Sequence, residues 1–108
     1  MNSRDKGKRG EREFAAKCRI YGYSVRRGQQ YCGANGDADV VGLPHVHVEV
    51  KRVERLNLED AMAQSIGDAQ AHELPVVAHR KNHGDWLVTM RFDDWMQLYR
   101  EWEAGFER

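Results

Sequence analysis

The segment from residue 37 to residue 51 constrains the fold of this chain most, because its residues alternate in character as a β-hairpin requires. Valines occupy positions 46, 48 and 50, and the charged residues Glu49 and Lys51 are interleaved with them. Successive side chains of a strand point to opposite faces of the sheet. The valines would therefore share one face, with Glu49 and Lys51 on the other. A turn near Pro44 would connect this strand to the preceding one.

This hairpin would bring acidic side chains together. With the turn centred near Pro44, cross-strand partners have numbers that sum to about 88, which pairs Asp39 with Glu49 and Asp37 with Lys51. Neighbouring carboxylates repel each other unless a cation neutralises them, and hard ions such as Mg²⁺ bind carboxylate oxygens. We therefore predict a metal site on this face. A solvated sheet face with a cross-strand salt bridge is the alternative.

The length and composition predict one domain spanning residues 1–108, with residues 1–7 flexible. A chain of 108 residues with 41% hydrophobic residues is long enough to bury one core. The polar N-terminus predicts no signal peptide, and no window is apolar enough to cross a membrane. The two cysteines do not form a disulfide framework, which favours a reducing, cytoplasmic location.

Hydrophobic periodicity predicts an α/β fold with a central mixed β-sheet flanked by helices. The elements follow the order α-β-β-β-α-β-β-α. The expected helices span about residues 8–21, 58–72 and 92–104, and the expected strands span 23–27, 37–42, 45–51, 75–79 and 86–90. In the last helix, Trp95, Tyr99 and Trp102 fall on one side. We interpret this stripe as core, with a dimer interface or a base-stacking surface as alternatives.

Glu11 is a further candidate for the acidic cluster. Helical spacing places it in line with Phe14, on the apolar side of the first helix, where a carboxylate needs a partner. A Glu11 side chain that reaches Asp39 and Glu49 would have one. The alternative is that Glu11 extends to solvent at the end of the helix. Glu13 falls on another face and is expected to be an ordinary surface residue.

Although the formal net charge is zero, positive and negative residues are distributed unevenly along the chain. Residues 1–30 carry nine Lys and Arg against three Asp and Glu, whereas residues 31–108 carry eight against fourteen. Such an asymmetry can create one basic face on a neutral protein, although a solvated basic helix is the alternative. We interpret the following polar side chains as contacts to DNA phosphates: Lys6, Lys8, Arg9, Arg12, Arg26, Arg27 and Gln29.

The residues Asp39-Val-Val and, ten positions further on, Glu49-Val-Lys51 resemble the signature of the PD-(D/E)XK nucleases, with Ala38 in place of the proline. The wider pattern includes the Lys8-Arg-Gly-Glu-Arg-Glu-Phe helix start. Over about residues 6–90 it is similar to the archaeal-type Holliday junction resolvases and their small phage relatives. The resemblance implies a restriction-endonuclease-like fold, a phage or prophage origin, and a homodimer that cuts four-way DNA junctions with Mg²⁺, or Mn²⁺ in its place.

The resemblance also implies a set of site residues. The catalytic residues would be Glu11, Asp39, Glu49 and Lys51. The metal ligands would be Glu11, Asp39, Glu49 and the backbone carbonyl of Val50. Gln64 would be an accessory residue near the metal, with an ordinary surface glutamine as the alternative. Asp37 is an additional acid without an assigned role.

Several other interpretations stay open. The chain could be a virus-type replication-repair nuclease that acts on other branched or linear DNA, or a non-catalytic DNA-binding protein of the same fold. A small interaction domain with an acidic hairpin is a third class. We interpret the segment with His79, Asn82 and His83 as a solvated turn, because it lacks the partners of a zinc site. His45 and His47 flank Val46 on the polar side of the hairpin. We expect them on a strand surface, with a position facing the metal cluster as the alternative.

Overall fold

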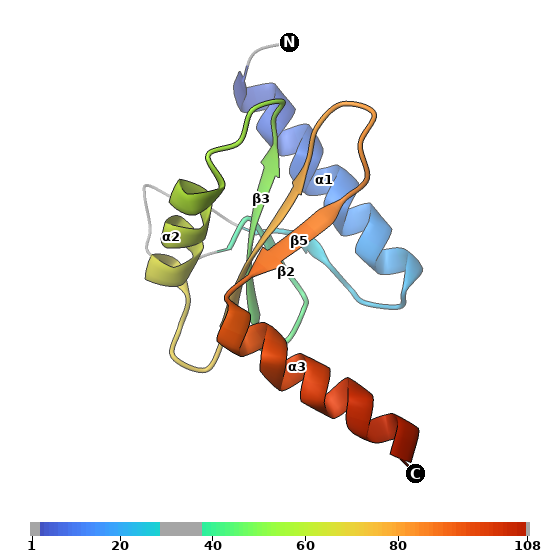
Figure 1. Ribbon diagram of the computed structural model, residues 1–108. Coiled ribbons are helices and arrows are strands. Elements are labelled where there is room, and N and C mark those ends of the chain that lie inside the picture. Colours follow the sequence, from blue (N-terminus) through green and yellow to red (C-terminus); the bar gives the residue numbers. More distant parts are fainter. Residues whose placement is uncertain (1–2, 29–37, 108) are drawn as a thin grey trace.

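The computed structural model describes residues 3–28 and 38–107, which form an α/β fold with a five-stranded mixed sheet (Figure 1). The helices are α1 (Ser3–Ile20), α2 (Leu58–Asp68), α3 (Phe92–Ala104) and the 3-10 helix η1 (Gly105–Glu107). The strands are β1 (Arg26–Arg27), β2 (Val40–Val41), β3 (Val46–Arg52), β4 (Leu74–Arg80) and β5 (Leu87–Met90). The predicted mixed sheet flanked by helices is confirmed. The observed order differs from the expected one at its end, where η1 follows α3.

The boundaries of several elements differ from those expected. α1 begins at Ser3 rather than at Lys8, so residues 3–7, which we expected to be flexible, are helical. β1 and β2 have only two residues each and are shorter than predicted. α2 starts as expected, because the Asn57 side chain accepts a hydrogen bond of 3.1 Å from the Asp60 amide and caps the helix.

The strands lie in the order β1-β2-β3-β4-β5. β3 and β4 are parallel and the other neighbouring pairs are antiparallel. Parallel neighbours need a crossover connection, and α2 provides it. In the β2–β3 pair, Val40 lies opposite Val48. The predicted register of the hairpin is therefore confirmed.

The two faces of β3 pack against different helices. Phe14 and Ala15 of α1 share one buried cluster with Val48 and Val50, which point to the same face. Opposite this face, the Lys51 side chain reaches Gln64 of α2. In Figure 1 the two helices accordingly lie on either side of the central strands. His47, Glu49 and Lys51 alternate with the valines and so share the face that α2 covers.

Two small residues allow the helices to approach the sheet closely. A side-chain carbon at Gly10 of α1 would lie 2.5 Å from the Cβ atom of Arg52, so only glycine fits there. In α2, the buried Ser65 hydroxyl donates to the backbone carbonyls of Val76 and His47, at 3.0 and 3.3 Å. These contacts hold α2 directly over the face that carries Glu49.

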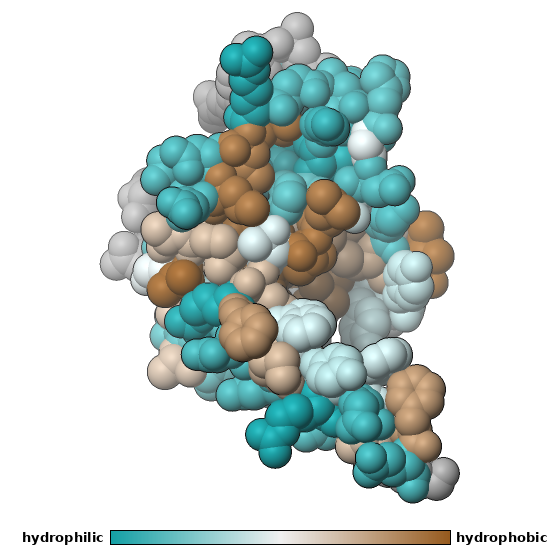
Figure 2. Space-filling view, viewed as in Figure 1, coloured by the Kyte–Doolittle hydropathy of each residue, from teal (hydrophilic) through white to brown (hydrophobic). Residues whose placement is uncertain are grey.

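The aromatic face of α3 is not part of the core. Trp95, Tyr99 and Trp102 are 48%, 40% and 64% exposed, and Phe92 and Phe106 continue the row on either side. Figure 1 shows α3 leaving the body of the protein, and Figure 2 shows pale and tan rings along it. Our interpretation of this stripe as core is therefore wrong: the helix lies beyond the end of the sheet, where nothing in the described chain covers it. Among the described residues, no helix is long and apolar enough to span a membrane.

Candidate metal centre

Asp39 is held beside Glu49 by the backbone of the β2–β3 pair. The Asp39 amide donates to the Val48 carbonyl at 3.0 Å, and the Asp39 carboxylate accepts a 2.7 Å hydrogen bond from the Val50 amide. Both acids are nearly buried, with exposed fractions of 8% for Asp39 and 2% for Glu49. The hairpin register thus places two carboxyl groups together, away from most of the solvent.

The environment of Glu49 strongly opposes a negative charge. Burial, then the charge of Asp39 and a hydrogen bond to it, raise the pKa of Glu49 from its ordinary value of 4.5 to about 8, against the opposing effect of Lys51. A second negative charge beside Asp39 is therefore unfavourable without a neutralising partner. A divalent cation could neutralise both carboxylates, so the donor set fits a hard ion such as Mg²⁺.

Lys51 follows Glu49 by two residues on the same strand face. Its ammonium group donates a 3.2 Å hydrogen bond to the side-chain oxygen of Gln64 on α2. The predicted catalytic lysine and the predicted accessory glutamine are therefore neighbours. Burial raises the pKa of both Glu49 and Glu11, and the positive charge of Lys51 opposes this rise, so the ammonium lies within electrostatic range of both acids.

Glu11 faces the sheet and does not extend freely into solvent. Its side chain is only 13% exposed and accepts a 2.8 Å charge-assisted hydrogen bond from Arg27. Burial is the main reason that the pKa of Glu11 is raised, and the charge of Asp39 raises it further. The structure therefore brings Glu11 near the acidic pair. It also gives Arg27, an expected DNA contact, a partner within the chain.

Glu13 is not the ordinary surface residue that helical spacing indicated. Its carboxylate forms ion pairs with Arg80 and, at 3.7 Å, with Arg52, and its side chain is 30% exposed. Both arginines come from the ends of the parallel strands. Glu13 thus joins α1 to β3 and β4, a tertiary contact that helical spacing does not reveal.

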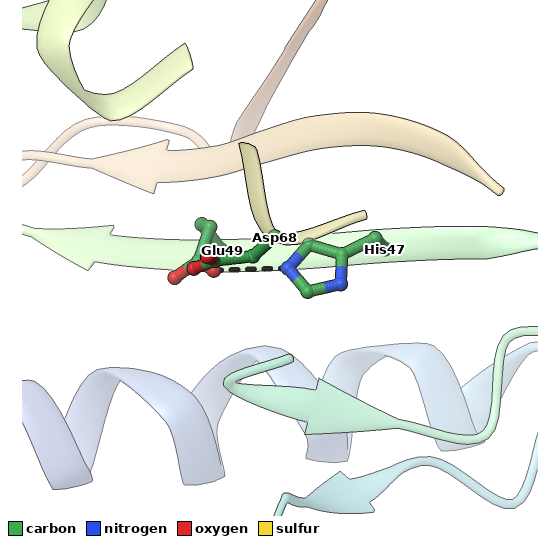
Figure 3. A group of neighbouring side chains, drawn as sticks. All are labelled: His47, Glu49 and Asp68. Carbon is green, nitrogen blue, oxygen red and sulfur yellow. Dashed lines mark hydrogen bonds and ion pairs between the residues drawn. The ribbon is translucent and has the colours of Figure 1, made fainter. Parts of the chain in front are cut away.

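Asp68 is a neighbour of Glu49 that sequence analysis missed, and His47 is one that it gave only as the alternative to a strand surface. The expectation that His47 lies on a strand surface is wrong, because the residue is 1% exposed and its Nε2 atom lies 3.0 Å from Glu49 Oε1. Asp68 closes the group from the last residue of α2 (Figure 3). The spacing of His47 and Glu49 could have predicted their contact, since residues two apart in a strand point to the same face of the sheet.

The remaining predicted residues lie around this group or outside the described chain. Arg9, Arg12 and Arg26 are exposed, and Lys6 and Lys8 are half-buried. Gln29 and Asp37 lie outside the described residues. His79 belongs to β4 and lies 2.9 Å from the Thr89 hydroxyl, so it is not part of a solvated turn as predicted. Burial lowers the pKa of His79.

Comparisons with protein-family models, curated proteins and solved structures found no match to this chain. The site itself therefore has to carry the functional interpretation. Within the described residues, the fold and site define an α/β protein whose sheet holds a buried acidic pair beside a lysine.

Proposed function

We propose that this chain is a Mg²⁺-dependent endodeoxyribonuclease that hydrolyses DNA phosphodiester bonds, with four-way junctions as its preferred substrate. The observation that carries the proposal is the pairing of Asp39 with Glu49 on adjacent strands, with Lys51 following on the same face. Two buried carboxyl groups beside an ammonium group destabilise the fold unless they serve a ligand. A divalent cation and a phosphate supply the charges that such a group would bind.

Asp39 and Glu49 would hold the cation, and Glu11 and the Val50 carbonyl are the further ligands that we propose. When bound, Mg²⁺ stabilises charge on a phosphate oxygen and makes a water molecule more acidic. The chain fixes the direction of the Asp39 carboxylate through the Val50 amide. This positioning before the substrate binds is what electrostatic catalysis requires.

Lys51 would act on the phosphate that undergoes attack. Its ammonium group is a mobile point charge that can stabilise the additional negative charge of the transition state. The 3.2 Å hydrogen bond to Gln64 holds this ammonium on the side of the sheet that α2 covers. Gln64 would therefore be a positioning residue for Lys51, which gives a role to the predicted accessory glutamine.

Exposed arginines on α1 and β1 would bind the DNA backbone. Arg9, Arg12 and Arg26 have exposed side chains. Phosphate contacts of this kind position DNA without reading its sequence, and they weaken as the salt concentration rises. Arg27 would contact phosphate only by sharing its guanidinium group with Glu11, whereas Gln29 lies outside the described residues.

Two finer parts of this proposal rest on the resemblance in sequence. One is the restriction-endonuclease-like arrangement of the sheet, and the other is a homodimer that would place two sites on one junction. Sedimentation of the purified protein measures the oligomeric state directly. A monomer at the concentration that cuts junctions would remove the homodimer from the proposal and leave the chemistry of the site in place.

The experiment is a cleavage assay with Mg²⁺ on a labelled four-way junction, its duplex arms and its single strands. It compares the wild type with Asp39→Asn, and with Asp93→Asn on the exposed side of α3 as the matched control. Paired symmetric nicks in the junction, lost only in Asp39→Asn, support the proposal. Cleavage of every substrate would support the nuclease activity and contradict the preference for junctions. Tight junction binding without any cutting would favour a non-catalytic DNA-binding protein.

A further inference from the structure

A second group of potential metal ligands lies beside the acidic pair, on the side of Glu49 that faces α2. His47, Glu49 and Asp68 each offer one ligand atom, and these three atoms all lie within 4.8 Å of one another (Figure 3). His47 and Glu49 come from β3, whereas Asp68 comes from α2. The group therefore depends on the packing of the helix over the strand, which the Ser65 hydrogen bonds fix.

The imidazole of His47 has the surroundings of a metal-binding histidine. Its Nε2 atom points to Glu49 Oε1 at 3.0 Å, and its Nδ1 atom faces Glu73 Oε1 at 3.8 Å. A carboxylate beside the nitrogen that does not bind the metal commonly orients the ring of a metal-bound histidine and strengthens its bond to the metal. The ring is 1% exposed, so the surrounding protein atoms fix its position beside Glu49.

The three residues also leave room for exchange with solvent. His47 and Glu49 are buried, whereas Asp68 is exposed at the end of α2. A cation could reach the group past Asp68 and keep a water molecule as a further ligand. Three protein ligands and one water form the usual arrangement of an open zinc site.

We propose that His47, Glu49 and Asp68 form a binding site for a borderline divalent transition ion, with Zn²⁺ as the expected occupant. The imidazole decides the class of ion, because Mg²⁺ prefers ligand sets made only of oxygen, whereas zinc readily accepts nitrogen beside carboxylates. This site differs from the proposed Mg²⁺ site in its nitrogen ligand and in its use of α2. The two share Glu49. The inference concerns metal binding and does not depend on the proposed nuclease activity.

The test is a calorimetric titration of the full chain with Zn²⁺ in a large excess of Mg²⁺, without DNA. Asp68→Asn removes one ligand from an exposed position, so the variant should fold. Asp60→Asn, an exposed aspartate in the same helix, is the matched control. We expect Asp68→Asn to weaken Zn²⁺ binding at least tenfold, on the order of the effect seen when the support of a metal ligand is removed. Asp60→Asn should bind like the wild type.

Asp39→Asn separates this site from the proposed Mg²⁺ site. We expect Zn²⁺ binding in excess Mg²⁺ to persist in Asp39→Asn, because Asp39 is not a ligand of the His47 group. Binding that is lost in Asp39→Asn but unchanged in Asp68→Asn would overturn the inference, since the ion would then occupy the pair of carboxylates of Asp39 and Glu49. The inference would also be overturned if Mg²⁺ displaced Zn²⁺ from the wild type at comparable concentrations of the two ions. A failure of DNA cleavage would change none of these binding results.

Discussion

Replacing Glu49 by glutamine should stabilise the folded protein at alkaline pH while removing the proposed activity. Glu49 has a pKa of about 8 in the folded protein, against an ordinary value of 4.5, because it is buried beside Asp39. Between these two pH values the folded chain binds one proton that the unfolded chain has lost. The free energy of unfolding must therefore fall as the pH rises.

The magnitude follows from the size of the shift. Each pKa unit corresponds to about 1.4 kcal/mol, so a shift of about 3.5 units removes at most ~5 kcal/mol of stability between pH 5 and pH 9. A domain of this size has a total stability of about 5 to 15 kcal/mol, so the loss is large. Glutamine cannot ionise, and its amide can still donate a hydrogen bond to Asp39. We expect Glu49→Gln to match the wild type near pH 5 and to exceed it by a few kcal/mol at pH 9.

The assay is urea unfolding of both proteins from pH 5 to pH 9, with a chelator present so that no divalent cation binds. Glu101→Gln on α3 is the matched control, because its side chain is exposed, and its profile should run parallel to that of the wild type. Two results would contradict the unfavourable charge of the buried acidic pair. One is a Glu49→Gln variant less stable than the wild type at pH 9, and the other is a difference in unfolding free energy between the two proteins that does not change with pH. Added Mg²⁺ should restore wild-type stability at pH 9 and have little effect on Glu49→Gln.

Three further predictions concern the contacts of the helices. Gly10→Ala should cost about 1 to 3 kcal/mol of stability, because the new carbon would overlap Arg52 Cβ. Gly7→Ala in the same helix meets no atom within 4 Å and should stabilise by about 0.5 to 1 kcal/mol, so equal effects of the two variants in thermal unfolding would contradict the close contact at Gly10. Glu13→Gln should lower the free energy of unfolding by about 1 to 2 kcal/mol, because it weakens the ion pairs with Arg80 and Arg52. DNA cleavage should be unchanged at a temperature where the variant is folded, and lost cleavage in a folded variant would give Glu13 a role in the site. Trp102→Ala should cost less than about 1 kcal/mol in dilute solution, since the side chain is 64% exposed; a larger loss that grows with protein concentration would mean that another surface covers α3.

The parts of the fold that the sequence predicted well are those with a strong local pattern. Alternating valines identified β3. A turn centred near Pro44 predicted the register of the hairpin, in which Val40 lies opposite Val48. The apolar periodicity of α3 gave its limits correctly. Periodicity reports which side of a helix is apolar, however, and not whether anything covers that side. The exposed aromatic face of α3 could not be read from the pattern for this reason.

The candidate site was predictable where it lies within the hairpin, and less so where it depends on other elements. Asp39 and Glu49 are brought together by local strand pairing. Asp68 reaches Glu49 only because α2 crosses over the sheet between two parallel strands. The ion pair of Glu13 with Arg80 likewise joins residues far apart in the chain, and the spacing of charges along a helix carries no signal for such a contact.

The most direct test of the central claim is the Mg²⁺ dependence of single-turnover cleavage of a four-way junction by the wild type and by Glu49→Gln. Wild-type cleavage should require Mg²⁺ and saturate with it. Glu49→Gln, although as stable as the wild type or more so, should not cleave at any Mg²⁺ concentration. Cleavage by the wild type in the presence of a chelator, or cleavage by Glu49→Gln at the wild-type rate, would contradict the claim that this acidic pair is a metal-dependent nuclease site.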